Sequence, residues 1–182
     1  TGHALQHMPT RVDEGGVAGI SGVEWDAVEQ PSQFMEYWVT RPGVLRTMAR
    51  HWRTGEPMPS ELIERIRSAK TYRQATFVCR QLEFAMTDLA LHDASFAPSA
   101  GQSIFDIHRE VAARTGVRAP HPDNRFLCSF AHIFAGGYSA GYYSYMWAEV
   151  LSADGFAAFE EAALDDERAV GRPGQLYADP VP

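Results

Sequence analysis

Four residues near the start of the chain are of the types that bind zinc, namely His3, His7, Glu24 and Glu29. His3 and His7 stand four residues apart, a spacing that places both imidazole rings on one face of a helix. The pair imitates the zinc motif H-E-x-x-H, but an alanine stands where that motif has its catalytic glutamate. The spacing alone leaves two interpretations open, a helical metal site and a pair of ordinary surface histidines.

A second register of the same motif ends at His3. If the two residues before Thr1 were histidine and glutamate, the start would read H-E-T-G-H, and His3 would be the second ligand of a zinc helix. A downstream glutamate would then be the third ligand, and Glu29 follows about one loop later. Three protein ligands and an open water position form the layout of a catalytic zinc site.

An aromatic, glycine-rich segment is the second candidate for chemistry. Tyr138, Tyr142 and Tyr145 are spaced four and three residues apart, so on a helix they would share a face. A phenol close to a scissile carbonyl can donate a hydrogen bond to the oxyanion that develops there. Three glycines would let the segment close over a peptide: Gly136, Gly137 and Gly141. Composition alone favours a simpler alternative, an aromatic face packed beside Trp147.

The elements that must hold these residues are predicted to be helical. Apolar periodicity predicts helices over residues 2–8, 23–40 with a restart at Pro31, 44–53, 60–92, 104–114 and 142–163. Glycine-rich loops or irregular strand are expected over 13–22 and 135–141, and the tail from residue 171 is expected to be irregular or loosely packed. The predicted fold class is therefore all-α, with glycine-rich loops and room for a small irregular β segment.

Some polar residues are expected to have structural roles only. Arg80 and Gln81 lie in an otherwise apolar helix, where they would bridge helices or line a cleft. His108 has no acidic or histidine partner at ligand spacing, which predicts a surface position or a satisfied hydrogen bond.

Composition excludes several classes of protein. The chain has 182 residues, 45% of them hydrophobic, and a net charge of −7, which fits one globular domain without a basic nucleic-acid-binding stripe. No apolar run is long enough to predict a membrane span, and no signal peptide is recognised. Cys79 and Cys128 are too few for a disulfide scaffold, so a reducing interior compartment is expected.

Three segments resemble the M3 (thimet oligopeptidase) family of zinc metallopeptidases. They read EWDAVEQPSQFME at 24–36, CRQLEFA at 79–85, and FLCSFAHIFAGGYSAGYYSY at 126–145, with WAEV at 147–150. The resemblance covers about residues 1–165 and implies a mostly helical zincin-type catalytic subdomain. It makes residues 1–170 the C-terminal part of a catalytic domain and 171–182 a proline- and glycine-rich tail.

The resemblance also implies roles for the acidic and histidine residues. His3 and Glu29 match zinc ligands, so Zn²⁺ is the implied cofactor. Glu24 matches the carboxylate that orients a ligand histidine, whereas His7 has no role in the family. The family's first histidine and its general-base glutamate match no position here and would lie immediately before Thr1.

The same resemblance assigns the aromatic segment to the peptide substrate. Residues that match substrate contacts are His132, Gly136, Gly137, Tyr138, Tyr142 and Tyr145. Of these, Tyr138 and Tyr145 match the residues that stabilise the oxyanion, and this reverses the preference for a merely packed aromatic face.

Two functions follow from this reading. In the first, the chain is part of a zinc metalloendopeptidase that hydrolyses short unfolded peptides in the cytosol or an organelle interior, the plastid stroma or mitochondrial matrix in a plant-like source. Its partners would be those peptides and the N-terminal part of the peptidase or another subunit. With two ligands and no base, these 182 residues alone are expected to be inactive.

The second possible function is that of a non-catalytic remnant, in which the chain serves as a structural or interaction subunit of a larger assembly.

Overall fold

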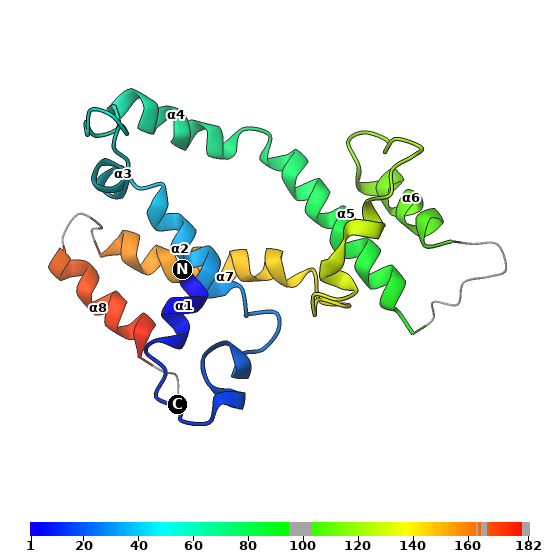
Figure 1. Cartoon of the computed structure of the whole chain (residues 1–182), viewed down its shortest axis with the longest axis horizontal. Coiled ribbons are helices and arrows are strands. Elements are labelled where there is room, and N and C mark those ends of the chain that lie inside the picture. The colour runs from blue at the N-terminus through cyan, green and yellow to red at the C-terminus, as the bar shows by residue number, and fades with distance from the viewer. Residues whose placement is uncertain (95–102, 163, 165–166, 180–182) are drawn as a thin grey trace. The chain divides into compact units, whose positions relative to one another are not determined.

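The fold of the chain is all-α, as a computed structural model shows (Figure 1). The structure describes residues 1–94, 103–162, 164 and 167–179. These ranges contain eight α-helices, four short 3₁₀ helices and no β-sheet, while one isolated antiparallel bridge joins Arg50 and Pro57. The predicted fold class is therefore confirmed. No helix in the same ranges has both the length and the apolar character needed to cross a membrane.

The chain divides into two compact units, which are described separately. The first unit comprises Thr1–Tyr72 and Trp147–Pro182, and the second comprises Arg73–Met146. The first unit contains α1 (Gly2–His7), η1 (Gly15–Val17), η2 (Gly19–Gly22), α2 (Gln30–Val39), α3 (Pro42–Met48), α4 (Ser60–Thr71), most of α7 (Ser144–Glu161) and α8 (Glu167–Ala178). The second unit contains α5 (Gln74–His92), α6 (Ile104–Thr115), η3 (Phe126–Ser129) and η4 (Ala131–Ile133).

The core of the first unit is an aromatic cluster centred on Phe34 of α2. Its ring lies 5.9 Å from that of Phe156 and 5.4 Å from that of Phe159, both on α7. α2 begins at Gln30, with Pro31 in its first turn, where a proline loses no intrahelical hydrogen bond. The helix predicted from residue 23 therefore starts later, and residues 25–29 form turns instead.

Residues 171–178 belong to a helix, so the prediction of irregular structure there was wrong, while the end of the predicted tail, residues 180–182, lies outside the described residues. α8 runs across residue 170 to Ala178 and contains Pro173. Tyr177 of α8 stacks on Phe34 with ring centroids 4.1 Å apart, and its hydroxyl donates to Oε1 of Gln30 at 3.0 Å. Packing of this kind against α2 offsets the helix-breaking effect of the proline, because tertiary contacts outweigh local propensity.

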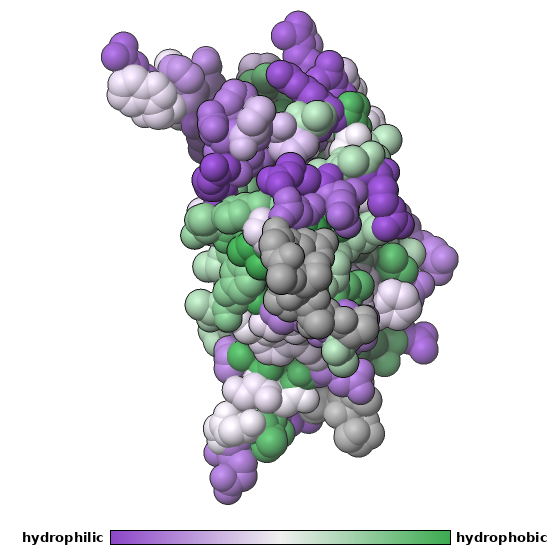
Figure 2. Space-filling view, turned by 90° about the vertical axis from the view of Figure 1, so that its right-hand side faces the viewer, coloured by the Kyte–Doolittle hydropathy of each residue, from purple (hydrophilic) through white to green (hydrophobic). Residues whose placement is uncertain are grey.

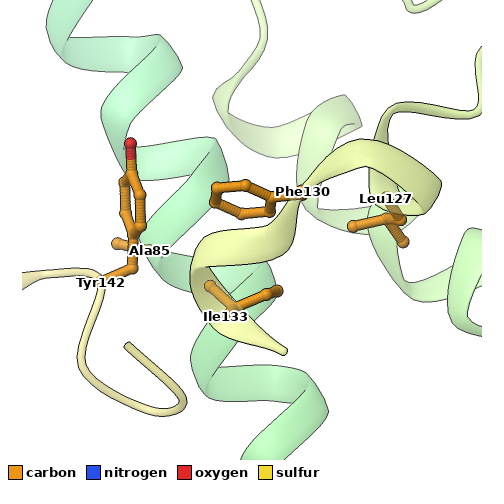
Figure 3. Packing of buried hydrophobic residues seen from close by; sticks show 5 residues of the cluster. All are labelled: Ala85, Leu127, Phe130, Ile133 and Tyr142. Atoms are coloured by element: carbon orange, nitrogen blue, oxygen red, sulfur yellow. The ribbon is translucent and has the colours of Figure 1, made fainter. Parts of the chain in front are cut away.

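The second unit is built on α5, which is separated from α4 by a left-handed residue. Arg73 has φ of 55°, so the single helical region predicted over 60–92 is two helices. η3, η4 and the segment after them pack on α5, and the buried residues of this cluster are Ala85, Leu127, Phe130, Ile133 and Tyr142. In Figure 3, the rings of Phe130 and Tyr142 lie beside the α5 ribbon that carries Ala85.

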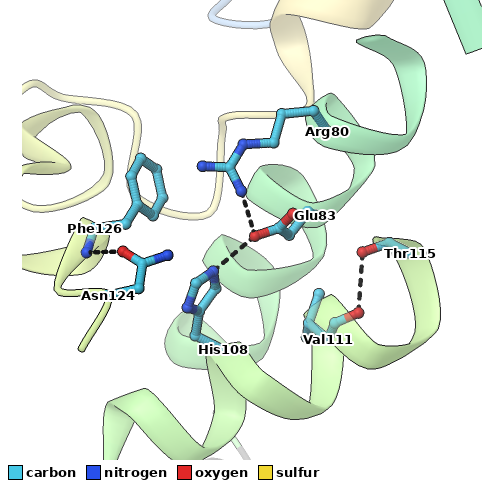
Figure 4. Close-up of polar contacts among 7 residues, drawn as sticks. All are labelled: Arg80, Glu83, His108, Val111, Thr115, Asn124 and Phe126. Atoms are coloured by element: carbon cyan, nitrogen blue, oxygen red, sulfur yellow. Dashed lines mark hydrogen bonds and ion pairs between the residues drawn. The ribbon is translucent and has the colours of Figure 1, made fainter. Parts of the chain in front are cut away.

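A buried polar network joins α5 to α6 (Figure 4). Oε1 of Glu83 lies 2.5 Å from Nη1 of Arg80 and 2.8 Å from Nε2 of His108. The guanidinium of Arg80 also lies over the rings of Phe84 and Phe126. His108 thus has a satisfied hydrogen bond, as one of the two predicted alternatives had it, but its partner is a carboxylate that the local spacing did not reveal, and Arg80 pairs within α5 while its guanidinium reaches Phe126.

Large hydrophobic side chains also lie at the surface. Figure 2 shows hydrophobic residues gathered in a broad area between more hydrophilic ones on the face in view. Among the described residues, Trp52 and Met48 of the first unit are 79% and 72% exposed. Exposed apolar surface of this kind is typical of contact with another protein segment or ligand.

Candidate active site

The two predicted zinc ligands lie together in the first unit. Nε2 of His3, on α1, is 3.2 Å from Oε2 of Glu29, the residue that precedes α2, although 26 positions separate them in the sequence. The hydroxyl of Ser32 donates to the same carboxylate oxygen at 2.8 Å and fixes its orientation. The His3 side chain is 35% exposed and that of Glu29 is 13% exposed, so the pair is sheltered but still open to a ligand.

Gly2 is the reason that His3 can approach Glu29. It is buried, and a Cβ at this position would lie 2.1 Å from the carbonyl oxygen of Pro31 and 2.6 Å from Cα of Ser32. Only a glycine allows α1 to pack this closely on the first turn of α2. Our sequence reasoning missed this role, although a glycine within a helix and next to a candidate ligand was a visible signal.

The His3–Glu29 pair fits part of a zinc site. Its nitrogen and carboxylate oxygen are both donor types that zinc prefers, and they converge on one point. Nδ1 of His3 is buried and has no hydrogen-bond partner among the described residues. Over the described ranges, no cluster of three or more histidine, cysteine, aspartate or glutamate side chains could hold a metal ion. The described part of the chain therefore offers two candidate ligands at this point, whereas a catalytic zinc takes three from protein.

Glu24 and His7 lie apart from this pair. Glu24 is exposed, and it does not bond Nδ1 of His3, which is without a partner in the described part of the chain. The ring of His7 packs on the glycine-rich turn, where a Cβ at Gly19 would lie 2.1 Å from its Nδ1. The structure thus gives His7 a packing role, and the orienting role of Glu24 stays a prediction.

The three predicted tyrosines lie together around His132 in the second unit. The rings of Tyr138 and Tyr145 stack with centroids 4.9 Å apart, and the ring of Tyr142 lies 5.1 Å from that of Tyr145. The imidazole of His132 is 6.1 Å, 5.8 Å and 6.1 Å from the rings of Tyr138, Tyr142 and Tyr145. The shared helix face that the spacing suggested was wrong, because only Tyr145 belongs to α7, whereas Tyr142 lies in the turn before it and Tyr138 lies outside any regular element.

The glycines of this segment form the turn that returns the chain to His132. A Cβ at Gly136 would lie 2.8 Å from Cα of His132, and Gly137 has φ of +86°. The backbone N–H of Tyr138 then donates to the carbonyl of His132 at 2.9 Å. Both glycines are required by the turn itself, while their predicted contact with substrate stays a prediction.

Tyr142 differs from its two neighbours because it belongs to the core. It is 9% exposed, and its hydroxyl donates to Oε1 of Gln81 at 3.2 Å. Burial raises the pKa of Tyr142, and the nearby Tyr145 raises it further, against the opposing charge of Arg80. Its hydroxyl is thus engaged inside the protein, and its role in substrate contact stays a prediction.

Asp88 is a second residue that our sequence reasoning missed. It is fully buried on α5, and its carboxylate accepts the backbone N–H groups of Ala140 and Tyr142, each at 2.9 Å. An aspartate in the predicted helix, directly before Leu89 and one turn after Phe84 and Ala85, was the signal that could have found it, because buried carboxylates need partners.

The arrangement offers two chemical capabilities, one in each unit. The imidazole and carboxylate of the first unit can share a metal ion. The stacked phenols of the second unit can donate hydrogen bonds to a negative oxygen, as an oxyanion hole does.

Comparison with known proteins places these features in context. The family model described as Peptidase family M3 matches residues 1–176. Organellar oligopeptidase A, chloroplastic/mitochondrial, of Arabidopsis thaliana is 54% identical over 180 residues, which are 99% of this chain and 23% of the relative. Oligopeptidase A of Escherichia coli (strain K12) is 48% identical over 181 residues, 99% of this chain and 26% of the relative. Saccharolysin of Saccharomyces cerevisiae is 33% identical over 159 residues, 84% and 21% of the two chains. The chain spans about a quarter of the length of the curated relatives it matches.

Proposed function

Because the chain belongs to peptidase family M3, we propose that the protein that carries it is a zinc-dependent oligopeptidase. Its substrates would be short unfolded peptides. His3 and Glu29 would be two of the zinc ligands, and Tyr138 and Tyr145 would donate hydrogen bonds to the oxyanion. The names of the relatives, which are oligopeptidases from plants and bacteria, support this assignment.

The contact between His3 and Glu29 is the observation that carries the proposal. Two residues far apart in sequence, both of zinc-binding type, meet at 3.2 Å, and a glycine with no room for a side chain lets them meet. Ser32 orients the carboxylate through a 2.8 Å hydrogen bond. When bound, zinc would supply Lewis-acid activation of the peptide carbonyl and a water of lowered pKa.

The tyrosine pair would stabilise the negative charge that develops on the carbonyl oxygen of the peptide. Stacking at 4.9 Å keeps the phenol groups of Tyr138 and Tyr145 side by side, and the ring of His132 restrains both. Preorganised donors of this kind stabilise the oxyanion without having to reorient during the reaction. His132, Gly136, Gly137 and Tyr142 would contact the peptide around them.

The remaining parts of the proposal concern partners and location. We expect the exposed apolar side chains, such as Trp52 and Met48, to pack on the N-terminal part of the peptidase or another subunit. A polypeptide of only these 182 residues would hold zinc through two ligands without the family's general base, so we expect it to hydrolyse peptides poorly.

The relatives carry names that place them in chloroplasts and mitochondria or in the cytosol, and we propose such an interior compartment here. Residues 1–170 would belong to the catalytic domain, and Glu24 would orient a ligand histidine.

Hydrolysis of a quenched fluorescent peptide by the natural polypeptide tests the proposal. We expect turnover that a zinc chelator abolishes and added zinc restores. His3→Ala should lower kcat/KM by at least about a hundredfold, while His7→Ala, four residues along the same helix, should change it less than about twofold. Chelator-resistant turnover, or a His3→Ala variant of full activity, would overturn the proposal. An intact but inactive polypeptide would instead favour the non-catalytic remnant.

A further inference from the structure

Both oxygens of the Asp88 carboxylate are used to hold one turn of the chain. Oδ1 accepts the N–H of Ala140 and Oδ2 accepts the N–H of Tyr142, each at 2.9 Å, across 52 and 54 positions of sequence. The aspartate is 0% exposed. Residues 138–142, here called the tyrosine turn, are therefore fastened to the middle of α5 at two points.

We propose that Asp88 is a positioning residue for the oxyanion donors, an inference that rests on the proposed function of Tyr138 and Tyr145. The tyrosine turn begins at Tyr138 and leads directly into the first turn of α7, which carries Tyr145. Fixing the turn at Ala140 and Tyr142 fixes the stretch of backbone that lies between the two phenols.

The conformation of the turn shows why it needs an anchor. Ala140 has φ of 56°, a left-handed conformation that disfavours residues with a Cβ. Other bonds also hold the turn: the N–H of Gly141 donates to the carbonyl of Tyr138 at 2.9 Å, the N–H of Tyr138 donates to the carbonyl of His132 at 2.9 Å, and the hydroxyl of Ser139 donates to the carbonyl of Ile133 at 2.7 Å. The N–H of Ala140 itself is bonded to Asp88, and this bond supports the left-handed conformation of Ala140.

The position of Asp88 is itself well determined. Nδ1 of His92, one turn further along α5, lies 2.9 Å from Oδ1 of Asp88 and 2.9 Å from its backbone carbonyl. On the side of the turn, the ring of Tyr142 packs against those of Phe84 and Phe130, with centroids 5.6 Å and 5.1 Å away. A rigid helix thus presents a restrained acceptor to the turn, which is the condition for accurate placement of reacting groups.

A carboxylate fits this task better than an amide of the same shape. Asparagine has one acceptor oxygen, and its NH₂ group would face one of the two backbone N–H donors. Asp88→Asn should therefore release either Ala140 or Tyr142 and leave a buried N–H unpaired, while the side-chain volume stays almost unchanged.

A double-mutant cycle in the natural polypeptide tests the inference. Asp88→Asn should lower kcat by about ten- to a hundredfold with KM changed less than about threefold, because small misplacements of catalytic groups act on the transition state. In a Tyr145→Phe background, the same substitution should cost at least about threefold less than in the unaltered protein, because coupled residues are not additive, although Tyr138 still depends on the turn. Amide exchange at positions 140 and 142 should become at least about tenfold faster.

Glu83→Gln is the matched control. It alters another buried carboxylate of α5, one that binds His108 and Arg80 and is not bonded to the tyrosine turn. It should lower the unfolding temperature while amide exchange at 140 and 142 stays within about twofold of the unaltered protein. If Asp88→Asn does not fold, Asp88→Ser, whose shorter side chain cannot span both donors, takes its place in the cycle.

The outcomes separate the inference from the function on which it rests. If Tyr145→Phe lowers kcat but Asp88→Asn is additive with it, or leaves exchange of the turn unchanged, the inference alone is wrong. If Tyr145→Phe keeps full kcat, the proposed role of the tyrosines fails and the inference fails with it. A strongly coupled cycle together with faster exchange at 140 and 142 establishes Asp88 as a positioning residue.

Discussion

Gly2 lies so close to Pro31 that a Cβ at position 2 would be 2.1 Å from the proline carbonyl oxygen. This approach joins α1 to the first turn of α2 and brings the next residue, His3, to Glu29. The contact between the two proposed zinc ligands therefore depends on a residue that has no chemistry of its own. Its contribution is the absence of a side chain.

Gly2→Ala should separate α1 from α2. Because the carbonyl of Pro31 is backbone and cannot rotate away, we expect a loss of about 1–3 kcal/mol in the free energy of unfolding, as for other overpacked sites. Zinc affinity should fall as well. Denaturant unfolding followed by circular dichroism measures the first effect, and metal titration the second.

Gly43→Ala is the control for this substitution. Among the described residues, nothing lies within 4 Å of a Cβ at Gly43, the second residue of α3, so alanine there should leave the free energy of unfolding unchanged or raise it by up to about 1 kcal/mol. Equal effects of the two substitutions would contradict the close approach of Gly2 to Pro31.

Steady-state kinetics should distinguish the roles of Tyr138 and Tyr145 from that of a neighbouring tyrosine. Tyr138→Phe and Tyr145→Phe each remove a hydroxyl but keep the ring, so the stacked pair should persist. We expect kcat to fall by about 10²–10³-fold for each variant with little change in KM, as when one oxyanion donor is lost. Tyr143→Phe, at an exposed neighbouring position, should retain nearly full kcat. Steady-state kinetics on one peptide decides, and a large effect only on KM would argue against oxyanion stabilisation.

Tyr37 should make stability depend on pH in alkaline solution. Burial, reinforced by the carboxylate of Glu149, raises the pKa of Tyr37 from 10.0 to about 12, and its hydroxyl donates to Glu149 Oε1 at 3.0 Å. Between these two values the unfolded chain loses the proton first, so rising pH favours unfolding. The stabilisation is fully present below pH 10 and is lost as pH rises toward 12.

Tyr37→Phe isolates this contribution. The difference in the free energy of unfolding between the protein and this variant should be constant below pH 10 and should shrink as the pH rises above it. A difference that stays constant through pH 12 would show that the tyrosine ionises at its ordinary pKa in the folded protein.

Sequence patterns predicted the helices that carry a regular apolar stripe or a clear cap. α6 is the best example, because Ser103 and Asp106 form a capping box at its start. The same patterns failed at α8, where Pro173 and two glycines favour irregular structure. Tyr177 reaches Phe34 and Gln30, which are more than 140 positions earlier, and no local rule describes such a contact.

In the candidate site, too, the sequence revealed some residues and not those that depend on distant contacts. Residue types and motif resemblance identified His3, Glu29 and the tyrosines, because their chemistry is visible in the sequence. Gly2 and Asp88 act through the backbone of distant segments, at Pro31 and at Ala140. Their roles are therefore visible only in the three-dimensional structure. The spacing of Tyr138, Tyr142 and Tyr145 predicted their proximity correctly, but for the wrong reason, since a turn rather than a helix brings them together.

The zinc content of the natural polypeptide tests whether His3 and Glu29 are zinc ligands. The protein, purified without chelators, should contain about one zinc per chain, as a single structural or catalytic site requires. His3→Ala and Glu29→Ala should each lose most of this zinc, and His7→Ala should retain it. If His3→Ala and Glu29→Ala hold as much zinc as the unaltered protein, the two residues do not bind the metal and the proposed function is wrong in its zinc site.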